Sequence, residues 1–328
     1  MAILLNTRTG TSHVLKSLHV VGRDAGHSDT VLALADASAL HATFRWRDGQ
    51  WLLCDHSRNG TFLNGRPLRK DNPVTLSPRD EVRFGMLDGT PWRVSDLSPP
   101  GDVLVPLTPG PTIIALDTYL ALPDEQDPQT CLYRTAVGQW MQETPEGTRD
   151  LRDGDEFAVG AQRWRLICCD DTQATLDLRN LRGESCLKFQ TSLDEEHVHV
   201  TLYNGSQEFD MGERVHHYLL LVLARHRLRD VSQGLDPLAQ GWVDLDDLVR
   251  MLDMDRVHLN IQLFRLRKQF AEAIAEGLIS DHFIERRRGG VRIGEIGLEL
   301  RQGSRLENVW RPAAPLAPLQ STSHTSQP

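Results

Sequence analysis

Residues 19–85 of this chain carry three polar clusters: Gly22-Arg23, Ser38-Ala39-Leu40-His41 and Ser57-Arg58-Asn59-Gly60-Thr61-Phe62-Leu63-Asn64-Gly65. Short apolar runs lie between and around them, at residues 31–34, 43–46, 51–54 and 81–84. Runs of this length and composition are typical of short β-strands. The sequence therefore predicts a β-sandwich with the polar clusters on the loops at one end, where binding residues are commonly found.

In this order the clusters resemble those of the forkhead-associated (FHA) domain, a module that binds phosphothreonine peptides. The resemblance covers roughly residues 1–98 and implies an all-β sandwich. It implies that Arg23 contacts the phosphate, that Ser38 donates its hydroxyl to it, and that His41 supports the loop. It further implies that Asn59 hydrogen-bonds the ligand backbone while Gly60 and Thr61 shape the loop. A guanidinium, a hydroxyl and loop amides are the groups that hold a phosphate dianion.

Two positions depart from the usual FHA pattern. Ala39 stands where the family usually has a polar residue, and it offers no side-chain hydrogen bond. Arg58 stands where many members have Ser or Thr before Asn-Gly. Arg58 either supplies the phosphate contact that Ala39 lacks or points into water. The alternative to phosphate binding is an FHA-like sandwich that has kept the fold and lost the ligand.

Residues 102–180 are again rich in predicted strands and contain a weak internal echo of the first domain. The segment 131–140 is similar to 42–51, and 151–160 is similar to 76–85. We interpret this region as a degenerate FHA-like sandwich without the phosphate-binding clusters, serving as a spacer or docking surface. The alternative is an unrelated small β-rich domain.

The region 185–300 changes to an α+β pattern. Asp210 and Asp244 are predicted N-caps of its first two helices. A third helix, 256–272, has an apolar stripe of Leu259, Leu263, Leu266 and Phe270, and a β-hairpin with a Gly-Gly turn follows at 283–293. This order resembles the winged helix-turn-helix effector domain of bacterial response regulators.

That second resemblance implies DNA binding by the third helix and the hairpin. Asn260 and Gln262 are candidates for reading base edges. The candidates for neutralising phosphates are Arg265, Arg267, Lys268, Arg286, Arg287, Arg288 and Arg292. The alternative is that these arginines form a solvated face and that the winged helix binds protein. Phe264 favours the alternative, because it lies near the predicted reading face.

The rest of the chain sets limits on function. Residues 302–328 are rich in Pro, Ser and Thr, which predicts a disordered tail. The five cysteines show no CxxC spacing, which argues against a disulfide framework and a zinc site, and no cofactor is expected. No apolar run is long enough to span a membrane and no signal peptide is recognised, which predicts a cytoplasmic location. The sequence contains no GxxxxGK[ST] or GxSxG motif and no kinase signature, so we expect no enzyme.

These observations lead to one main hypothesis and two rivals. The main hypothesis is a regulator that couples Ser/Thr kinase signalling to DNA binding and transcription, with a phosphothreonine-containing kinase or kinase substrate as its protein partner. The first rival is an FHA signalling adaptor whose winged helix binds protein. The second is a scaffold that no longer binds phosphate.

Overall fold

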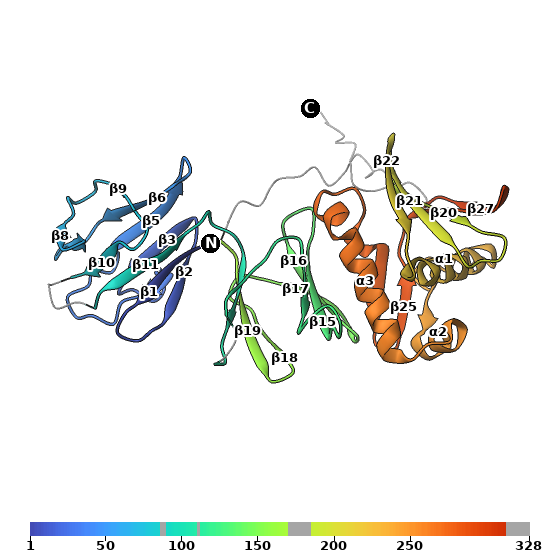
Figure 1. Ribbon diagram of the computed structural model, residues 1–328, viewed down its shortest axis with the longest axis horizontal. Helices are drawn as coiled ribbons and strands as arrows, with labels where there is room; N and C mark the ends of the chain where they lie inside the picture. Colours follow the sequence, from blue (N-terminus) through green and yellow to red (C-terminus); the bar gives the residue numbers. More distant parts are fainter. Residues whose placement is uncertain (86–89, 110–111, 170–184, 313–328) are drawn as a thin grey trace, which may run out of the picture. The chain divides into compact units, whose positions relative to one another are not determined.

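The computed structural model describes residues 1–85, 90–109, 112–169 and 185–312. The chain divides into two compact units, which are described separately. Unit 1 comprises Met1–Asp117 and Leu151–Gln173, and unit 2 comprises Thr118–Asp150 and Ala174–Pro328. Most of the described secondary structure is β-strand, and the α-helices all lie in unit 2 (Figure 1). Among the described residues, no helix has the length and apolar character needed to cross a membrane.

The first 98 residues form a sandwich of two sheets, here called the N-terminal sandwich. One sheet has the strand order β2-β1-β11-β10-β7-β8 and the other β4-β3-β5-β6-β9. The strands are β1 (Ala2–Asn6), β2 (Ser12–Leu15), β3 (Leu18–Gly22), β4 (Thr30–Val31), β5 (Ala42–Arg47), β6 (Gln50–Asp55), β7 (Thr61–Leu63), β8 (Arg66–Pro67), β9 (Val74–Thr75), β10 (Glu81–Phe84) and β11 (Trp92–Leu97). The FHA-type β-sandwich predicted for this region is confirmed.

Alternation along the strands builds the core of the N-terminal sandwich. In β6, Trp51, Leu53 and Asp55 are buried, whereas the side chains between them are more exposed. Phe44 of β5 and Phe84 of β10 meet in this core with their ring centroids 6.5 Å apart. Burial of large aromatic side chains such as these is a major source of stabilisation in a small domain.

The remainder of unit 1 is a four-stranded antiparallel sheet with the order β13-β12-β19-β18. Its strands are β12 (Val103–Pro106), β13 (Ile114–Ala115), β18 (Glu156–Val159) and β19 (Gln162–Ile167). Val14, Val103 and Cys169 share a small core that joins this sheet to the N-terminal sandwich. Lys16 also forms an ion pair of 2.7 Å with Asp153.

Unit 2 begins with a meander of four antiparallel strands, here called the β14–β17 sheet. The strands are β14 (Tyr119–Leu122), β15 (Thr130–Arg134), β16 (Trp140–Thr144) and β17 (Gly147–Leu151). The β-rich character predicted for residues 102–180 thus holds for the described part of that range. The proposed relation of this range to an FHA domain stays a prediction.

The C-terminal part of unit 2 contains two further sheets and the helices. A five-stranded sheet has the order β22-β21-β20-β26-β27, and a three-stranded sheet has the order β23-β25-β24. The strands are β20 (Ser185–Thr191), β21 (Val198–Asn204), β22 (Gln207–Glu213), β23 (Val243–Asp244), β24 (Ile284–Arg287), β25 (Gly290–Ile293), β26 (Gly297–Gln302) and β27 (Arg305–Trp310). The helices are α1 (His216–Ser232), α2 (Leu245–Leu252), α3 (Arg256–Ala275) and the 3-10 turn η2 (Asp281–Phe283).

Two local expectations for this region are wrong and one is confirmed. Asp244 is the N-cap of α2, and its side chain accepts a hydrogen bond from the backbone of Asp246 at 2.7 Å. Asp210 is not an N-cap, because β22 continues to Glu213 and α1 begins only at His216. The predicted tail also begins too early, because residues 305–310 form β27 and pair with β26. The rest of the tail, 313–328, lies outside the described residues.

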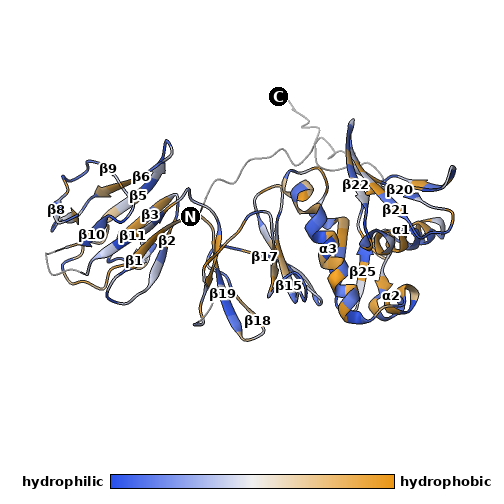
Figure 2. Ribbon diagram, in the orientation of Figure 1, coloured by the Kyte–Doolittle hydropathy of each residue, from blue (hydrophilic) through white to orange (hydrophobic). Residues whose placement is uncertain are grey.

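Helix α3 is packed on more than one side. Apolar and polar residues are interleaved along it (Figure 2), and it contacts α1, α2 and the strands β14 and β15. The predicted stripe of Leu259, Leu263, Leu266 and Phe270 is buried, as expected for a helix with one core-facing side. Gln262, Phe264 and Arg267, which lie outside this stripe, are buried as well. The helix therefore has little free surface.

Candidate functional site

The predicted phosphate-binding loops are held together from the end of β3. Gly22 must be a glycine, because a Cβ atom there would lie 1.9 Å from the carbonyl oxygen of Ala39. This close approach lets the Arg23 amide donate a hydrogen bond of 2.9 Å to the carbonyl of Ser38. The Arg23 side chain is exposed, and its guanidinium donates to the Ala35 carbonyl at 3.4 Å. Arg23 is therefore fixed by its backbone while most of its charged end faces solvent.

His41 ties the Ser38 loop to the following loop. Its Nδ1 accepts a hydrogen bond of 3.1 Å from the Ser38 amide, and its Nε2 lies 3.2 Å from the Gly60 carbonyl. The ring is fully buried and meets Phe84 edge-on. Burial lowers the pKa of His41, which keeps the ring neutral at pH 7. A neutral ring with its proton on Nε2 satisfies both contacts.

Asp55, which sequence reasoning missed, organises the third cluster. Its Oδ1 accepts hydrogen bonds of 2.7 Å from the hydroxyls of Ser57 and Thr61, and the Ser57 hydroxyl in turn accepts from the Gly60 amide at 2.7 Å. Thr61 is completely buried and so shapes the loop from below. The sequence did contain a signal for this role. Asp55 stands at a position of β6 that alternation predicts to be buried, and a buried carboxylate needs several hydrogen-bond donors.

Arg58 and Asn59 lie at the exposed crest of the same loop. The Arg58 amide donates to the Ser38 hydroxyl at 3.1 Å, so the backbones of the two loops are adjacent. The Asn59 side chain donates to the Asp36 carbonyl at 2.7 Å. Gly85, with φ of +84°, leaves the space that Asp36 occupies. Together with the contact of His41 to Gly60, these bonds tie the loops of Ser38 and Asn59 at three points.

The arrangement places two guanidinium groups, a hydroxyl and an amide on adjoining loops. Arg23, Arg58 and Asn59 are exposed, and Ser38 is half-buried. Ala39 is exposed and offers no side-chain hydrogen bond, so Arg58 is the residue next to Ser38 with a charge to offer. Charge-assisted hydrogen bonds from such groups suit a phosphate dianion.

Three of the arginines predicted to bind DNA are buried in unit 2. Arg267 of α3 is 1% exposed, and its guanidinium contacts the carboxylate of Glu143, on β16, at 2.8 Å. The same guanidinium donates to the carbonyls of Asp281 and Ile284 at 2.9 Å and lies over the ring of Tyr133. Burial alone would lower the pKa of Arg267, but attraction to Glu143 outweighs it and the net shift is upward.

Arg286 of β24 reaches the same carboxylate. Its guanidinium lies 3.4 Å from the second oxygen of Glu143 and donates to the Asn260 side chain at 2.6 Å. It also lies over the ring of Phe264. Glu143 is completely buried, and two arginines from two different elements compensate its charge. Asn260 is partly buried and already engaged by Arg286.

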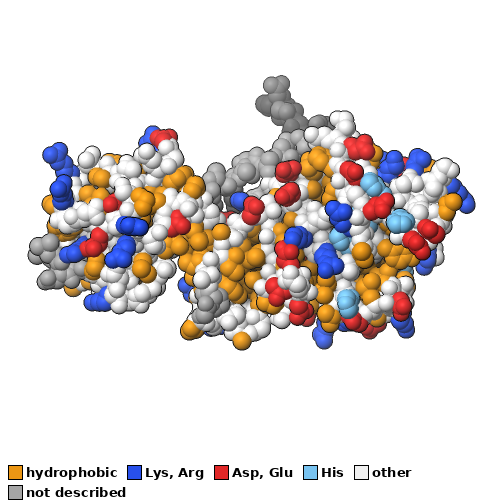
Figure 3. Space-filling view, viewed as in Figure 1, with side chains coloured by type: hydrophobic (Ala, Val, Ile, Leu, Met, Phe, Trp, Pro, Cys, Tyr) orange, Lys and Arg blue, Asp and Glu red, His pale blue; other side chains and the backbone are white. Residues whose placement is uncertain are grey.

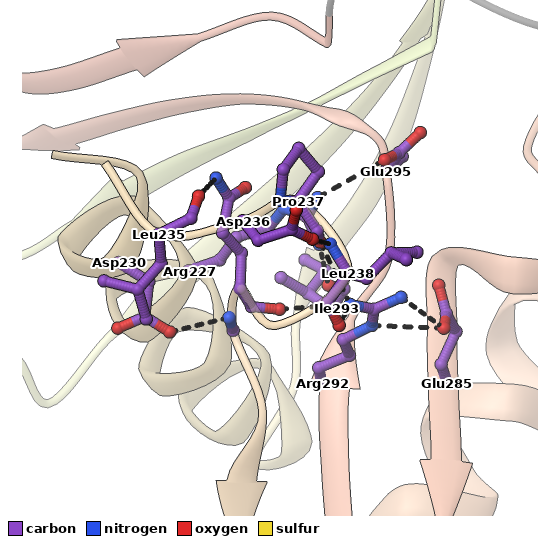
Figure 4. Close-up of polar contacts among 12 residues, drawn as sticks. Arg227, Asp230, Leu235, Asp236, Pro237, Leu238, Glu285, Arg292, Ile293 and Glu295 are labelled. Atoms are coloured by element: carbon purple, nitrogen blue, oxygen red, sulfur yellow. Dashed lines mark hydrogen bonds and ion pairs between the residues drawn. The ribbon is translucent and has the colours of Figure 1, made fainter. Parts of the chain in front are cut away.

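Arg292 of β25 holds the loop between α1 and β23 (Figure 4). It pairs with Glu285 at 2.7 Å and donates to the carbonyls of Pro237, Leu238 and Gln240 at 3.3, 3.0 and 3.2 Å. The side chain is 9% exposed, and its guanidinium lies over the ring of Trp242. Its donors are directed to protein acceptors, which identifies a structural arginine.

The DNA-contacting roles predicted for Gln262, Arg267, Arg286 and Arg292 therefore do not agree with the structure. All four side chains are at most 9% exposed, and the three arginines are paired with Glu143 or Glu285. Among the residues predicted to contact DNA phosphates, four have exposed side chains: Arg265, Lys268, Arg287 and Arg288. Of these, Lys268 pairs with Glu125 at 2.6 Å and Arg287 lies over Trp242. Figure 3 shows acidic and basic side chains intermixed on the visible face of unit 2.

Comparison with known proteins supports the first domain only. Residues 19–85 match the family model described as the FHA domain, so the chain contains an FHA domain. A comparison with curated proteins gives no match. Several solved FHA domains match 28–30% of this chain.

Three of these solved structures illustrate the similarity. The FHA domain of the CT664 protein from Chlamydia trachomatis is 25% identical and matches 29% of this chain and 98% of that chain, with a TM-score of 0.25. The N-terminal FHA domain of Rad53p from S. cerevisiae, solved with a phosphothreonine peptide, is 23% identical and matches 28% and 90%, with a TM-score of 0.26. Mycobacterium tuberculosis EmbR, solved with a low-affinity phosphopeptide, is 23% identical and matches 30% and 25%, with a TM-score of 0.27.

Proposed function

We propose that this chain is a phosphothreonine-peptide-binding signalling adaptor. The observation that carries the proposal is the convergence of Arg23, Ser38 and Arg58 on loops that His41 and Asn59 tie together. FHA domains are phosphopeptide-recognition modules, and this chain has the exposed donors that such recognition needs. The ligand is a phosphothreonine segment of a Ser/Thr kinase or of a kinase substrate.

Each group has a separate task in the proposed complex. Arg23 and Arg58 supply charge-assisted hydrogen bonds to the phosphate, each contributing about 1.5–3 kcal/mol. Ser38 adds a hydroxyl, and Asn59 meets the peptide backbone. His41, Gly60 and Thr61 do not need to touch the ligand, because their contacts set the shape of the two loops. The fixed backbone lowers the entropy lost when the peptide binds.

Binding of labelled peptides to the full chain tests this function. A library of phosphothreonine peptides is compared with the same peptides without phosphate and with phosphoserine in place of phosphothreonine. We expect phosphate-dependent binding that Arg23→Ala weakens at least about tenfold. Arg47→Ala is the matched control, because Arg47 is an exposed arginine of the same sandwich that pairs with the neighbouring Asp48. Equal binding of phosphorylated and unphosphorylated peptides would contradict the proposal and favour the scaffold that no longer binds phosphate.

The covered face of α3 favours the adaptor over the DNA-binding regulator. The side chains that would have entered a DNA groove are packed against the β14–β17 sheet of the same unit, and their charges are compensated there. Unit 2 then serves as a protein-binding or spacing element. Exposed Arg265, Arg287 and Arg288 keep DNA binding as the second candidate function. Retention on DNA as a function of salt decides between them.

A further inference from the structure

Three side chains with metal-binding chemistry meet on the outer side of β6. Cys54, His56 and Asp71 each bring one ligand atom to within 4.8 Å of the other two. Cys54 and His56 are two residues apart and therefore lie on the same side of the chain as it leaves β6, opposite the buried Leu53 and Asp55. Asp71 arrives from the loop between β8 and β9. The ligands come from separate segments, so the lack of a CxxC motif does not argue against them.

Backbone hydrogen bonds hold this group, here called the β6 cluster, in place. The His56 amide donates to the His41 carbonyl at 2.8 Å, and the Asp71 amide donates to the Asp55 carbonyl at 2.8 Å. His56 Nδ1 lies 2.7 Å from a carboxylate oxygen of Asp71, and its Nε2 lies 3.0 Å from the Thr43 hydroxyl. The Thr43 hydroxyl can accept a hydrogen bond from a proton on Nε2 of His56. The lone pair of Nδ1 is then free to bind a metal, as in many ligating histidines.

We propose that the β6 cluster binds a divalent transition metal of the zinc type through Cys54 Sγ, His56 Nδ1 and one oxygen of Asp71. A thiolate, an imidazole and a carboxylate are the three ligand types that Zn²⁺ accepts in proteins, and water takes the fourth tetrahedral position. On binding, the Cys54 thiol releases its proton to solvent and a metal–sulfur bond forms. The metal links β6 to the loop that carries Asp71.

The ligands have room to adjust to a metal. Bonds of about 2.0–2.3 Å place the ligand atoms of a tetrahedral site roughly 3.3–3.8 Å apart, so the His56 and Asp71 atoms, now 2.7 Å apart, must separate slightly to admit the metal. The Asp71 side chain is 64% exposed and that of His56 26% exposed, so both can rotate without opening the core. Without metal, the side chains of His56 and Asp71 satisfy each other through their 2.7 Å contact.

Cobalt and zinc titrations of the full chain, stripped with a chelator, test the proposal. We expect a sulfur-to-cobalt charge-transfer band and tetrahedral d–d bands that zinc abolishes, with a chromophoric chelator giving the zinc affinity. Cys54→Ser is expected to remove the charge-transfer band, and Asp71→Asn to weaken zinc binding at least about tenfold. Zinc should also raise the unfolding temperature of the unaltered chain.

Two control variants separate this site from other side chains. Cys168→Ser removes another half-buried thiol, and His27→Gln removes an exposed histidine that pairs with Asp24 at 2.8 Å. Both are expected to bind cobalt and zinc as the unaltered chain does. Asp71 is exposed, so Asp71→Asn is the variant that leaves folding intact. No charge-transfer band, or a band that survives Cys54→Ser, would overturn the proposal and leave the β6 cluster as a hydrogen-bonded His56–Asp71 pair beside a thiol.

Discussion

The carboxylate of Glu143 and the guanidinium of Arg267 lie 2.8 Å apart, and each side chain is 1% exposed. The two residues are far apart in the sequence, on β16 and α3. Arg286 approaches the other oxygen of the same carboxylate. One buried carboxylate therefore pairs with two arginines. From the sequence alone, these arginines predict a surface that binds nucleic acid.

Removing the charge of Glu143 is expected to destabilise unit 2. In Glu143→Gln, two buried guanidinium groups lose their counter-charge, and breaking a buried ion pair from one side costs about 3–5 kcal/mol. Urea unfolding monitored by circular dichroism measures this loss. Glu125→Gln is the control, because the exposed Glu125–Lys268 pair contributes only about 0–1 kcal/mol. Similar unfolding midpoints for the two variants would show that Glu143 is not essential.

The covered face of α3 limits how strongly the chain can bind DNA. If only Arg265, Lys268, Arg287 and Arg288 reach phosphates, the slope of log affinity against log salt has a magnitude of at most about 3.6. We also expect no preference among DNA sequences, because of the two base-reading candidates Gln262 is buried and the Asn260 side chain accepts a hydrogen bond from Arg286. Fluorescence anisotropy with random duplexes at several salt concentrations provides the measurement. A steeper slope with a sequence preference would mean that α3 leaves the β14–β17 sheet.

Arg58 is expected to matter for phosphopeptide affinity because of Ala39. The loop contact between the Arg58 amide and the Ser38 hydroxyl places the Arg58 side chain next to the proposed phosphate position. Arg58→Ala should weaken binding about tenfold, the value of one charge-assisted hydrogen bond, without changing the unfolding midpoint. Titration of a phosphothreonine peptide with this variant and with Arg47→Ala gives the comparison. Unchanged affinity in Arg58→Ala would indicate that Arg58 points into water.

Gly22 is expected to tolerate no side chain. In Gly22→Ala, the new Cβ would lie 1.9 Å from the Ala39 carbonyl oxygen, so β3 and the Ser38 loop must separate. We expect a loss of about 1–3 kcal/mol of stability and weaker peptide binding, because Arg23 and Ser38 move with the backbone. Gly101→Ala, where nothing lies within 4 Å of the added atom, controls for the substitution itself. Peptide affinity and urea unfolding are measured on both.

His19 makes the N-terminal sandwich sensitive to acid. Burial lowers the pKa of His19 from 6.5 to about 4, and nearby Asp29 does not offset this effect. The folded state thus takes up this proton only at lower pH than the unfolded state. The stabilisation is complete above pH 6.5 and is lost as the pH falls toward 4, by about 3 kcal/mol in total.

A matched variant isolates this effect from other histidines. His216 of α1 has a pKa lowered to about 4 by burial and acts in the same direction in unit 2. The difference in unfolding free energy between the unaltered chain and His19→Gln, measured from pH 7 to pH 4.5, therefore reports on His19. We expect this difference to shrink as the pH falls. A difference independent of pH would mean that His19 has the same pKa in the folded and unfolded states.

Much of the local structure was predictable from residue patterns, because it depends on contacts close in the sequence. Alternating apolar residues predicted the strands of the N-terminal sandwich. The apolar stripe at helical spacing predicted α3, with both ends placed within a few residues of those observed. The Gly-Gly turn predicted the hairpin of β24 and β25. The FHA assignment rests on the order of three polar clusters along the chain. That order does not depend on where the strands between the clusters begin and end.

The surroundings of α3 were decided only by the tertiary structure. A basic helix has the same sequence pattern whether its arginines face water, DNA or a buried carboxylate, and Glu143 is 124 residues away from Arg267. The same holds for Asp55 and for the β6 cluster, whose members are brought together by strand pairing and loop return. The sequence by itself therefore determined which elements form and which chemistry they carry. Burial and charge pairing between distant segments decided which of those groups are left free to act.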